Sequence, residues 1–265
     1  MKLKSFICGL LLTSLLSSTA AFAEGDKKLE LLTPGELRVA TEGTAPPYSM
    51  RGPGGQISGL EIAVMTEVAK RLHLKLVPVV TKWDSILIGL QANKFDMSMA
   101  AIDITPERQK SVVFADAWIE SGGRILAPKD TSIKTPDDLK GKKIGAQVSS
   151  TYARLAEEHG AQLKNYSDIT SAVQDMINGN LDGVINDSIG NAYLIEHNHL
   201  PFVQVPGYLS QVQKGFTFAK GKPNLVAAVN KALADMKSDG TFARLTTAIV
   251  GLDPAPKNPV LTLPQ

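Results

Sequence analysis

Short apolar segments alternate with helical segments in the first part of the chain, and this alternation restricts the fold more than any other feature. Strands are predicted at residues 37–41, 75–80 and 95–100, and helices at 60–72 and 83–92 lie between them. Apolar residues in both helices recur at the spacing that places them on one face. A strand–helix–strand–helix–strand order is typical of a parallel sheet with helices on its faces. The sequence therefore predicts an α/β fold.

A second run of strands and helices predicts a second unit of the same kind. Its strands are expected at 124–128, 142–147, 162–166, 183–186 and 202–205. A further strand at 215–219 and two helices at 224–237 and 241–250 close the chain. Two lobes, each a sheet flanked by helices, with a cleft between them account for this series of elements.

The first residues have the features of a secretory signal peptide rather than of a folded element. Lys2 and Lys4 precede an apolar run, and a small-residue cleavage motif ends at Ala23. We expect residues 1–23 to be removed after export through the Sec pathway, so that Cys8, the only cysteine, leaves with them. The chain holds 28 basic and 26 acidic residues, and loss of the two lysines leaves a near-neutral protein. Neither nucleic acid nor a membrane surface is therefore an expected partner.

The polar corner after the third strand carries an arginine in an unusual place. Thr105 followed by Pro106 predicts a helix start, with a hydroxyl cap and proline at the first helical position. Arg108 then lies in the first turn, where the helix dipole favours acids over bases. An arginine beside free backbone N–H groups can bind an anion such as a carboxylate. The alternative is a surface arginine paired with Glu107 or Asp103, and the residues alone leave both open.

Several kinds of catalytic and metal chemistry lack their motifs. The segment 196–199 is the only place where histidines cluster, and two histidines two positions apart do not share a helix face. We therefore read that segment as a solvated loop and predict no metal site. The chain contains no G-x-S-x-G elbow, no phosphate loop and no dinucleotide-binding loop. No cofactor and no catalytic residue is predicted.

Several segments together carry a resemblance to a known family. They are LRVATEGTAPPYSM from Leu37, GLEI from Gly59, KWDSI from Lys82, FDMSMAAIDITPERQKSVVFAD from Phe95, the Asp137–Gly145 region and the Gly240-Thr241 pair. The chain resembles the polar amino-acid-binding proteins of bacterial ABC importers, which are family-3 extracellular solute-binding proteins. The resemblance runs from about Leu37 to Gly251.

The resemblance implies a two-lobed periplasmic-binding-protein fold of type II, in which each lobe is a sheet flanked by helices and a two-strand hinge joins them. The implied limits are residues 30–121 plus 216–252 for lobe 1, 122–215 for lobe 2 and 253–265 for an irregular tail. The hinge strands would lie near 120–123 and 213–216. Ligand is caught in such proteins when the lobes close about the hinge.

The resemblance also implies how the backbone groups of an amino acid would be bound. Arg108 matches the arginine that clamps the α-carboxylate, and Ser150 and Thr151 match the lobe 2 loop that closes on it from a helix N-terminus. Asp187 matches the acid that holds the α-ammonium, and the Ala101 backbone matches a strand end that contacts the ligand. A zwitterion needs one fixed cation and one fixed anion. Because Arg108 and Asp187 come from different lobes, ligand charge would drive closure.

Two positions depart from the family pattern. The family usually has a hydroxyl where this chain has Asp103, and an acid there would repel the ligand carboxylate unless a cation intervenes. It usually has a stacking aromatic where this chain has Ala45, which leaves room or leaves stacking to Trp83, with Tyr152 or Tyr48 as further candidates.

The implied ligand-side-chain positions are Glu42 and Trp83. If Glu42, Asp103 and Asp187 face the cleft with only Arg108 to balance them, the site favours a cationic ligand: arginine, lysine, ornithine or an arginine-derived conjugate. The alternatives are a solvated loop for Glu42, a core role for Trp83, and a structural partner of Arg108 or a helix cap for Asp103.

Three functions follow from this comparison. The first is a monomeric periplasmic protein that binds a small molecule, an amino acid or a derivative of one, without catalysis and delivers it to an inner-membrane ABC permease. The second is a periplasmic cyclohexadienyl dehydratase on the same fold, in which a cleft acid protonates the leaving hydroxyl of prephenate or arogenate; retention of Asp187 argues for binding instead. The third, a sensing domain of a receptor, would require a separate membrane partner.

Overall fold

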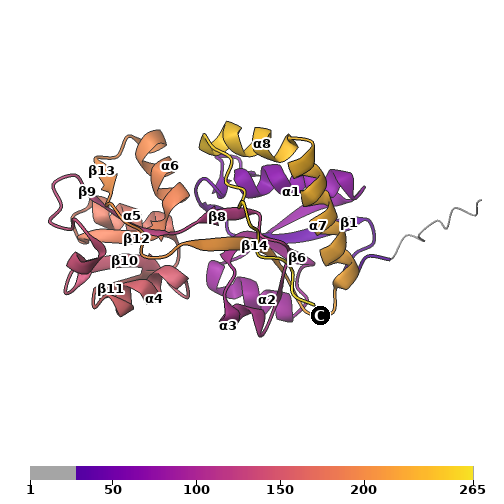
Figure 1. The fold of residues 1–265 in the computed structure, drawn as a ribbon, viewed down its shortest axis with the longest axis horizontal. Helices are drawn as coiled ribbons and strands as arrows, with labels where there is room; N and C mark the ends of the chain where they lie inside the picture. Colours follow the sequence, from indigo (N-terminus) through magenta and orange to yellow (C-terminus); the bar gives the residue numbers. More distant parts are fainter. Residues whose placement is uncertain (1–27, 265) are drawn as a thin grey trace, which may run out of the picture.

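Two sheets covered by helices form two lobes that lie side by side along the long axis of the molecule (Figure 1). The computed structural model describes residues 28–264, and the predicted signal peptide lies outside that part of the chain. Within residues 28–264, no helix is long and apolar enough to cross a membrane. The two-lobed α/β architecture expected from the sequence is confirmed.

Lobe 1 is built on a six-stranded sheet in the order β5-β1-β6-β14-β7, with β8 paired to β14. The strands are β1 (Glu36–Thr41), β5 (Lys75–Val80), β6 (Met97–Asp103), β7 (Val113–Phe114), β8 (Ile119–Ser121) and β14 (Val212–Phe218). β1 runs parallel to β5 and β6, while β14 returns antiparallel to β6. β14 therefore brings the end of the chain back into lobe 1. A small sheet of β2 (Thr44–Ala45), β3 (Ser49–Arg51) and β4 (Ile57–Ser58) lies beside it.

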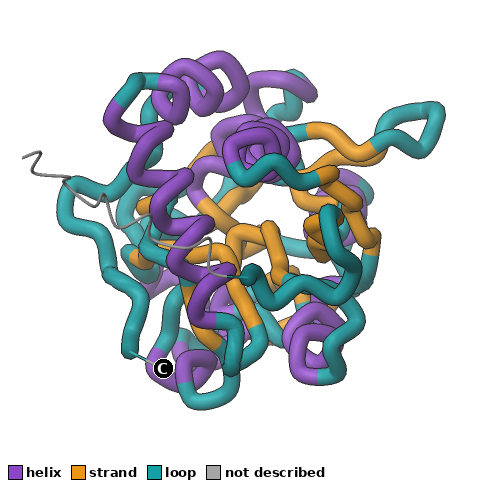
Figure 2. The backbone as a smooth tube through the Cα atoms, turned by 90° about the vertical axis from the view of Figure 1, so that its right-hand side faces the viewer, coloured by secondary structure: helices purple, strands orange, loops and turns teal. Residues whose placement is uncertain are grey.

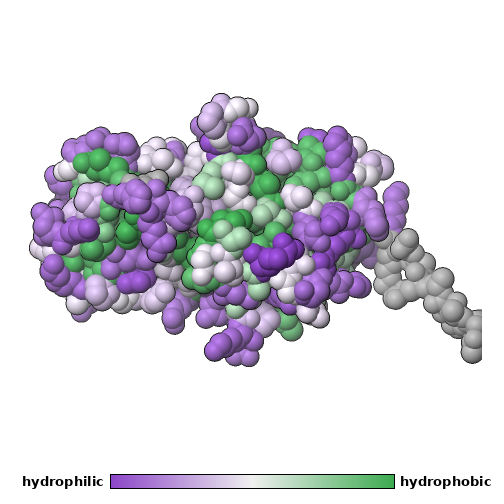
Figure 3. All heavy atoms as spheres, turned by 90° about the horizontal axis from the view of Figure 1, so that it is seen from above, coloured by the Kyte–Doolittle hydropathy of each residue, from purple (hydrophilic) through white to green (hydrophobic). Residues whose placement is uncertain are grey.

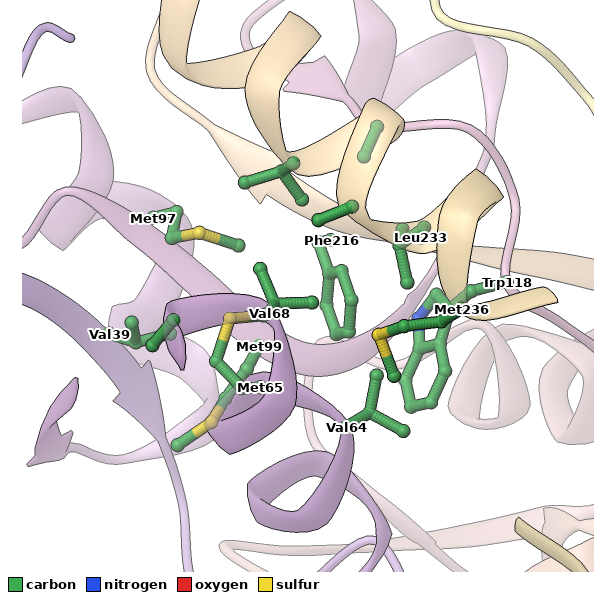
Figure 4. Close-up of a cluster of buried hydrophobic side chains, with 14 of the residues drawn as sticks. Val39, Val64, Met65, Val68, Met97, Met99, Trp118, Phe216, Leu233 and Met236 are labelled. Atoms are coloured by element: carbon green, nitrogen blue, oxygen red, sulfur yellow. The ribbon is translucent and has the colours of Figure 1, made fainter. Parts of the chain in front are cut away.

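Helices cover both faces of the lobe 1 sheet, and the end-on view shows them around the strands (Figure 2). They are α1 (Leu60–Arg71), α2 (Ile86–Gln91), α3 (Pro106–Gln109), α7 (Pro223–Ser238) and α8 (Thr241–Val250). Alternate strand residues serve opposite faces: Val39 packs with α1, α7 and α8, whereas Ala40 packs with α2. The larger core contains Trp118 stacked on Phe216 at 4.6 Å between ring centroids (Figure 4). The helix predicted at 83–92 instead begins as a 3₁₀ turn, Trp83–Ser85.

Lobe 2 repeats this arrangement on a five-stranded sheet in the order β11-β10-β12-β9-β13. Its elements are β9 (Gly123–Pro128), β10 (Lys143–Gln147), α4 (Thr151–Glu158), β11 (Gln162–Tyr166), α5 (Ile169–Ile177), β12 (Gly183–Asp187), α6 (Ser188–Asn198) and β13 (Phe202–Gln204), with a short 3₁₀ turn at Pro136–Leu139. α4 packs on one face of the sheet, and α5 and α6 pack on the other. Parallel strands β10, β11 and β12 place their carboxyl ends on one edge.

The lobes are joined by β8 and β14, which pair antiparallel with Gln213 opposite Glu120. They lie next to each other between the two lobes in Figure 1. Just beyond them, Gly122 passes so close to the other connection that a Cβ atom on it would lie 2.0 Å from the carbonyl oxygen of Ser210. Only glycine fits at that crossing without a backbone shift.

The segment after α8 crosses the hinge strands (yellow in Figure 1). The N–H of Glu120 donates to the carbonyl of Pro254 at 2.8 Å, and the N–H of Val260 donates to Oε1 of Gln213 at 2.7 Å. The N–H of Thr262 donates to Asp116 at 2.7 Å. Seen from above, the molecule carries hydrophilic side chains interspersed with smaller hydrophobic patches on both lobes (Figure 3).

Candidate functional site

A cavity lies where the carboxyl ends of strands from both lobes meet. Glu42 follows β1 and Asp103 ends β6 in lobe 1, while Gln147 ends β10 and Asp187 ends β12 in lobe 2. Open α/β sheets place ligands at such strand ends. Its volume is about 60 Å³, far below the several hundred Å³ of ordinary ligand pockets. In this arrangement of the lobes the cavity is too small for an amino acid.

The cavity brings together most of the residues expected from the sequence. It is lined by Glu42, Ala45, Pro46, Tyr48, Glu61, Trp83, Ala100, Ala101, Asp103, Gln147, Ser150, Thr151, Tyr152, Ile169, Asn186, Asp187, Gly190 and Lys214. Seven of the eight expected residues are therefore on its wall, and Arg108 is the exception. Glu61 and Lys214 line it without having been expected.

Arg108 lies in a hollow next to the cavity and shares the Trp83 wall with it. Thr105 caps the short helix as predicted, because its hydroxyl accepts the N–H of Arg108 at 3.2 Å. The guanidinium lies 5.8 Å from the centre of the Trp83 ring and donates to the carbonyl of Asp103 at 3.0 Å. It also reaches the carbonyl of Ser149 in lobe 2 at 3.5 Å. The pairing with Glu107 considered above is not formed.

Helix α4 begins at the edge of the cavity. Ser150 is its N-cap, and its hydroxyl accepts the N–H of Ala153 at 3.1 Å and donates to the carbonyl of Gln147 at 2.6 Å. The hydroxyl of the next residue, Thr151, donates to Asp103 across the cleft. The first turn of a helix has N–H groups without intrahelical partners, which favours an anion there.

Lys214 is the only cation on the cavity wall among the residues described, and the sequence reasoning missed it. It lies on β14 directly opposite Asp103 of β6, and its ammonium forms an ion pair with Asp103. It also lies 3.0 Å from the hydroxyl of Tyr152 and 3.3 Å from Oδ2 of Asp187. Its side chain is only 3% exposed. Burial by itself lowers the pKa of Lys214, but the two carboxylates outweigh that effect and raise its pKa above the ordinary value.

This lysine corrects two expectations about Asp103. The acid neither caps the helix nor pairs through its carboxylate with Arg108, because Lys214 and Thr151 hold its two oxygens. It also ends the strand instead of lying in the turn, since the cross-strand contact with Lys214 extends the pairing of β6 with β14. Lys214 is the intervening cation that the acid requires. The assumption that only Arg108 balances the charges of Glu42, Asp103 and Asp187 in the cleft was therefore wrong.

Asp187 is surrounded by donors from both lobes. Tyr48 of lobe 1 donates its hydroxyl to Oδ1 at 2.6 Å, and Tyr152 of lobe 2 donates to Oδ2 at 3.1 Å. Burial raises the pKa of Asp187, but the charge of Lys214 and the hydrogen bonds from Ser121, Tyr48 and the Gly190 N–H outweigh burial and hold its pKa below the usual value. The two tyrosines considered for stacking thus use their hydroxyls on this carboxylate.

Glu42 and Glu61 form the acidic wall of the cavity. Glu42 is buried, not part of a solvated loop, and accepts the amide of Gln147 at 3.2 Å and the hydroxyl of Thr44 at 3.0 Å. Glu61 lies on α1 and accepts the N–H of Ala101 at 3.0 Å. Burial raises the pKa of Glu42 to about 7 and that of Glu61 to about 8. Neither carboxyl forms an ion pair within residues 28–264.

Trp83 is half-buried. It lines the cavity and also packs against the smaller hydrophobic core of lobe 1. A core contribution and a place on the cavity wall are therefore both present. In the described part of the chain, no group of three or more histidine, cysteine or acidic residues is arranged to hold a metal ion.

The fold and this interlobe cavity define a solute-binding protein. The chain belongs to the bacterial extracellular solute-binding proteins, family 3, whose model matches residues 37–251. It is 30% identical over 240 residues to the L-cystine-binding protein TcyJ of Escherichia coli strain K12, covering 89% of this chain and 90% of that protein. The resemblance to binding proteins of amino-acid ABC importers is thereby confirmed.

Solved structures agree with this assignment. The crystal structure of the ancestral amino acid-binding protein AncCDT-1, a precursor of cyclohexadienyl dehydratase, is similar with a TM-score of 0.76 and 34% identity, over 82% of this chain and 95% of that one. An ancestral arginine-binding protein bound to glutamine is similar with a TM-score of 0.78 and 33% identity, over 83% of this chain and 99% of that one.

Proposed function

We propose that this protein binds an amino acid or amino-acid derivative between its lobes in the periplasm, without catalysis, and delivers it to an inner-membrane ABC permease. The observation that carries the proposal is the cavity at the strand ends of both lobes, which polar pairs bridge. Tyr48 reaches Asp187, and Thr151 reaches Asp103. A ligand that completes such contacts favours the closed arrangement over the open one.

The ligand carries a carboxylate and a cationic group in this proposal. A carboxylate on the ligand is supported by two neighbouring features. Helix α4 begins at Ser150 and Arg108 lies beside it, and both offer hydrogen-bond donors to an anion. Support for the cation is the wall of Glu42 and Glu61, two buried carboxyls without an ion pair in the described residues. Arginine, lysine, ornithine and arginine-derived conjugates combine these groups.

Export and a monomeric state belong to the same proposal. Residues 1–23 would direct export through the Sec pathway, with cleavage after Ala23. One copy of the chain supplies both walls of the cavity, so binding requires no second subunit. Size-exclusion chromatography with light scattering of the purified protein measures the oligomeric state directly.

A thermal-shift screen of refolded, ligand-free mature protein tests the proposal. The panel contains the common L-amino acids, ornithine, citrulline, cystine and arginine-derived conjugates. A ligand at a thousand times its dissociation constant adds about 4 kcal/mol to the free energy of unfolding. We expect a rise in Tm with compounds that carry a carboxylate and a side-chain ammonium or guanidinium. A rise confined to neutral amino acids would contradict the acidic-wall argument.

The dehydratase stays a second candidate because of one observation. The retention of Asp187 favours binding over catalysis only if its carboxylate is free to hold an α-ammonium. In the structure the ammonium of Lys214 lies against that carboxylate. Glu42 and Glu61 would supply a neutral carboxyl that can protonate a leaving hydroxyl. Turnover of prephenate, followed by ultraviolet absorbance of the product, separates this candidate from binding alone. Stoichiometric binding without product would exclude it.

A further inference from the structure

Asp187 already has a full set of hydrogen-bond donors. Oδ1 accepts the Tyr48 hydroxyl at 2.6 Å and the N–H groups of Ile189 at 3.0 Å and Gly190 at 3.3 Å; Oδ2 accepts the Ser121 hydroxyl at 2.5 Å and the Tyr152 hydroxyl at 3.1 Å, and lies 3.3 Å from the ammonium of Lys214. A carboxylate offers about four lone-pair positions. Six donors therefore leave no position for an ammonium that arrives with a ligand.

The ammonium beside Asp187 is part of the protein. Lys214 is held on β14 between Asp103 of lobe 1 and Asp187 of lobe 2, and it lies on the wall of the cavity. Expelling it would leave two buried carboxylates without their cation, which is strongly unfavourable. The Asp103–Lys214 pair also stands where the family resemblance expects a hydroxyl at position 103. Asp103 and Lys214 compensate each other in charge.

The opposite wall of the cavity has carboxyl groups without a cation beside them in the described residues. Glu42 is held by uncharged donors, the amide of Gln147 and the hydroxyl of Thr44. Glu61 accepts the Ala101 N–H and the Thr41 hydroxyl, and the hydroxyl of Ser49 is a further uncharged donor to it. A positive group on the ligand would find its carboxylates here and not at Asp187.

Resting on the proposed function, we propose that Lys214 takes the place of the ligand α-ammonium. The cleft then selects carboxylic acids without a free α-ammonium, and it binds their distant ammonium or guanidinium at Glu42 and Glu61. A free α-ammonium on the ligand would be brought close to Lys214 and left without an acceptor. Ligands of the ω-amino and ω-guanidino carboxylic acid class satisfy both ends.

Matched ligand pairs test this inference, because each pair differs only in the α-ammonium. The pairs are lysine and 6-aminohexanoate, ornithine and 5-aminopentanoate, and arginine and 5-guanidinopentanoate. Isothermal titration on the refolded mature protein should give at least roughly tenfold tighter binding for the member without the α-ammonium, since a charged hydrogen bond accounts for that much.

The Lys214→Met, Asp103→Ser double variant is designed to let Asp187 accept an α-ammonium from the ligand. It removes one charge of each sign, restores a hydroxyl at position 103 and frees a place at Asp187. We expect the preference within each pair to switch to the α-amino acid. Lys220→Met is the matched control, because Lys220 is exposed and donates to the carbonyl of Lys110 away from the cavity. Circular dichroism and thermal unfolding confirm that each variant is folded.

The outcomes separate the inference from the proposed function. Tighter binding of the α-amino acids by the unaltered protein would overturn the role of Lys214 and leave amino-acid binding intact. The same preference in the unaltered protein and a folded double variant would also overturn it. Absence of binding by both members of every pair, and by the wider amino-acid panel, would overturn the proposed function together with this inference.

Discussion

The ammonium of Lys214 lies 3.3 Å from the carboxylate of Asp187, on a strand that runs between the lobes. The same ammonium pairs with Asp103 of lobe 1, so one side chain links acids from both lobes. Both acids and the lysine are buried. This three-residue cluster sets the charge of the cleft before any ligand arrives.

Replacing Lys214 by methionine should destabilise the protein strongly. Two buried carboxylates would lose their cation, and breaking a buried ion pair in this way costs about 3–5 kcal/mol. Urea unfolding of the ligand-free protein measures the change in the free energy of unfolding. The added Asp103→Ser change should recover part of the loss, because it removes one of the two unpaired acids. A loss as small as that of Lys220→Met would contradict the ion-pair assignment.

Replacing Arg108 by alanine should weaken binding of carboxylate ligands by roughly 10- to 100-fold, the range expected for one lost charged hydrogen bond. Isothermal titration with the best ligand from the screen provides the measurement. Lys231→Ala is the control, because Lys231 is exposed on α7 and pairs with Asp235 away from the cavity. Unchanged affinity would leave Arg108 only its contacts with the carbonyls of Asp103 and Ser149.

Binding of a cationic ligand should strengthen as the pH rises from 6 to 8. Burial raises the pKa of Glu42 to about 7 and of Glu61 to about 8, so both are largely protonated at pH 6 without ligand. A ligand cation favours their ionised forms, and binding then releases protons. Each released proton contributes up to about a tenfold gain in affinity per pH unit, and the gain ends above the higher pKa.

Titrations in buffers of different ionisation enthalpy count the released protons. The Glu42→Gln variant keeps a hydrogen-bonding side chain but cannot ionise, so its affinity should depend less steeply on pH. A flat pH profile for the unaltered protein would mean that the ligand cation binds elsewhere.

Replacing Gly122 by alanine should destabilise the hinge. The added Cβ would lie 2.0 Å from the carbonyl oxygen of Ser210, and relief requires the two connections to separate. Such overpacking costs about 1–3 kcal/mol. Thermal unfolding shows the loss, and X-ray scattering with ligand shows incomplete closure. Gly52→Ala is the control, because its new Cβ would meet only the flexible side chain of Gln56. Equal melting temperatures for the two variants would contradict the close crossing.

The fold was largely predictable because its signals are local. Thr105 and Pro106 specify a helix start with their own chemistry, and the structure has that cap. Apolar positions of α1 such as Val64 and Val68 repeat at helical spacing and are buried. The strand β6 was placed too early, since its last residues are fixed by pairing with β14, more than a hundred positions away. Such long-range pairing leaves no local pattern.

The site was predictable in position but not in charge. Strand-end residues such as Glu42 and Asp187 lie on the cavity wall, since parallel sheets present those ends together. Lys214 was missed because a lysine in a strand reads as an exposed residue. One signal existed: Asp103 at a hydroxyl position requires a cation, and Lys214 is the only charged residue of β14. Glu61 gave a similar signal within the apolar face of α1.

The tail that crosses β8 and β14 bears on where the molecule would bend. Its hydrogen bonds to Glu120 and Gln213 hold both strands to lobe 1, so we expect any rotation of the lobes to occur at the Gly122–Ser210 crossing. Displacement in a rotation grows with distance from its axis. If the lobes rotate about this crossing, we expect Asp187, which pairs with Gly123 next to it, to move little and to keep its ionic contact with Lys214. The contact of Thr170 with the carbonyl of Thr44 would then break. Such an opening would expose the acidic wall to ligand while Asp103, Lys214 and Asp187 stay together.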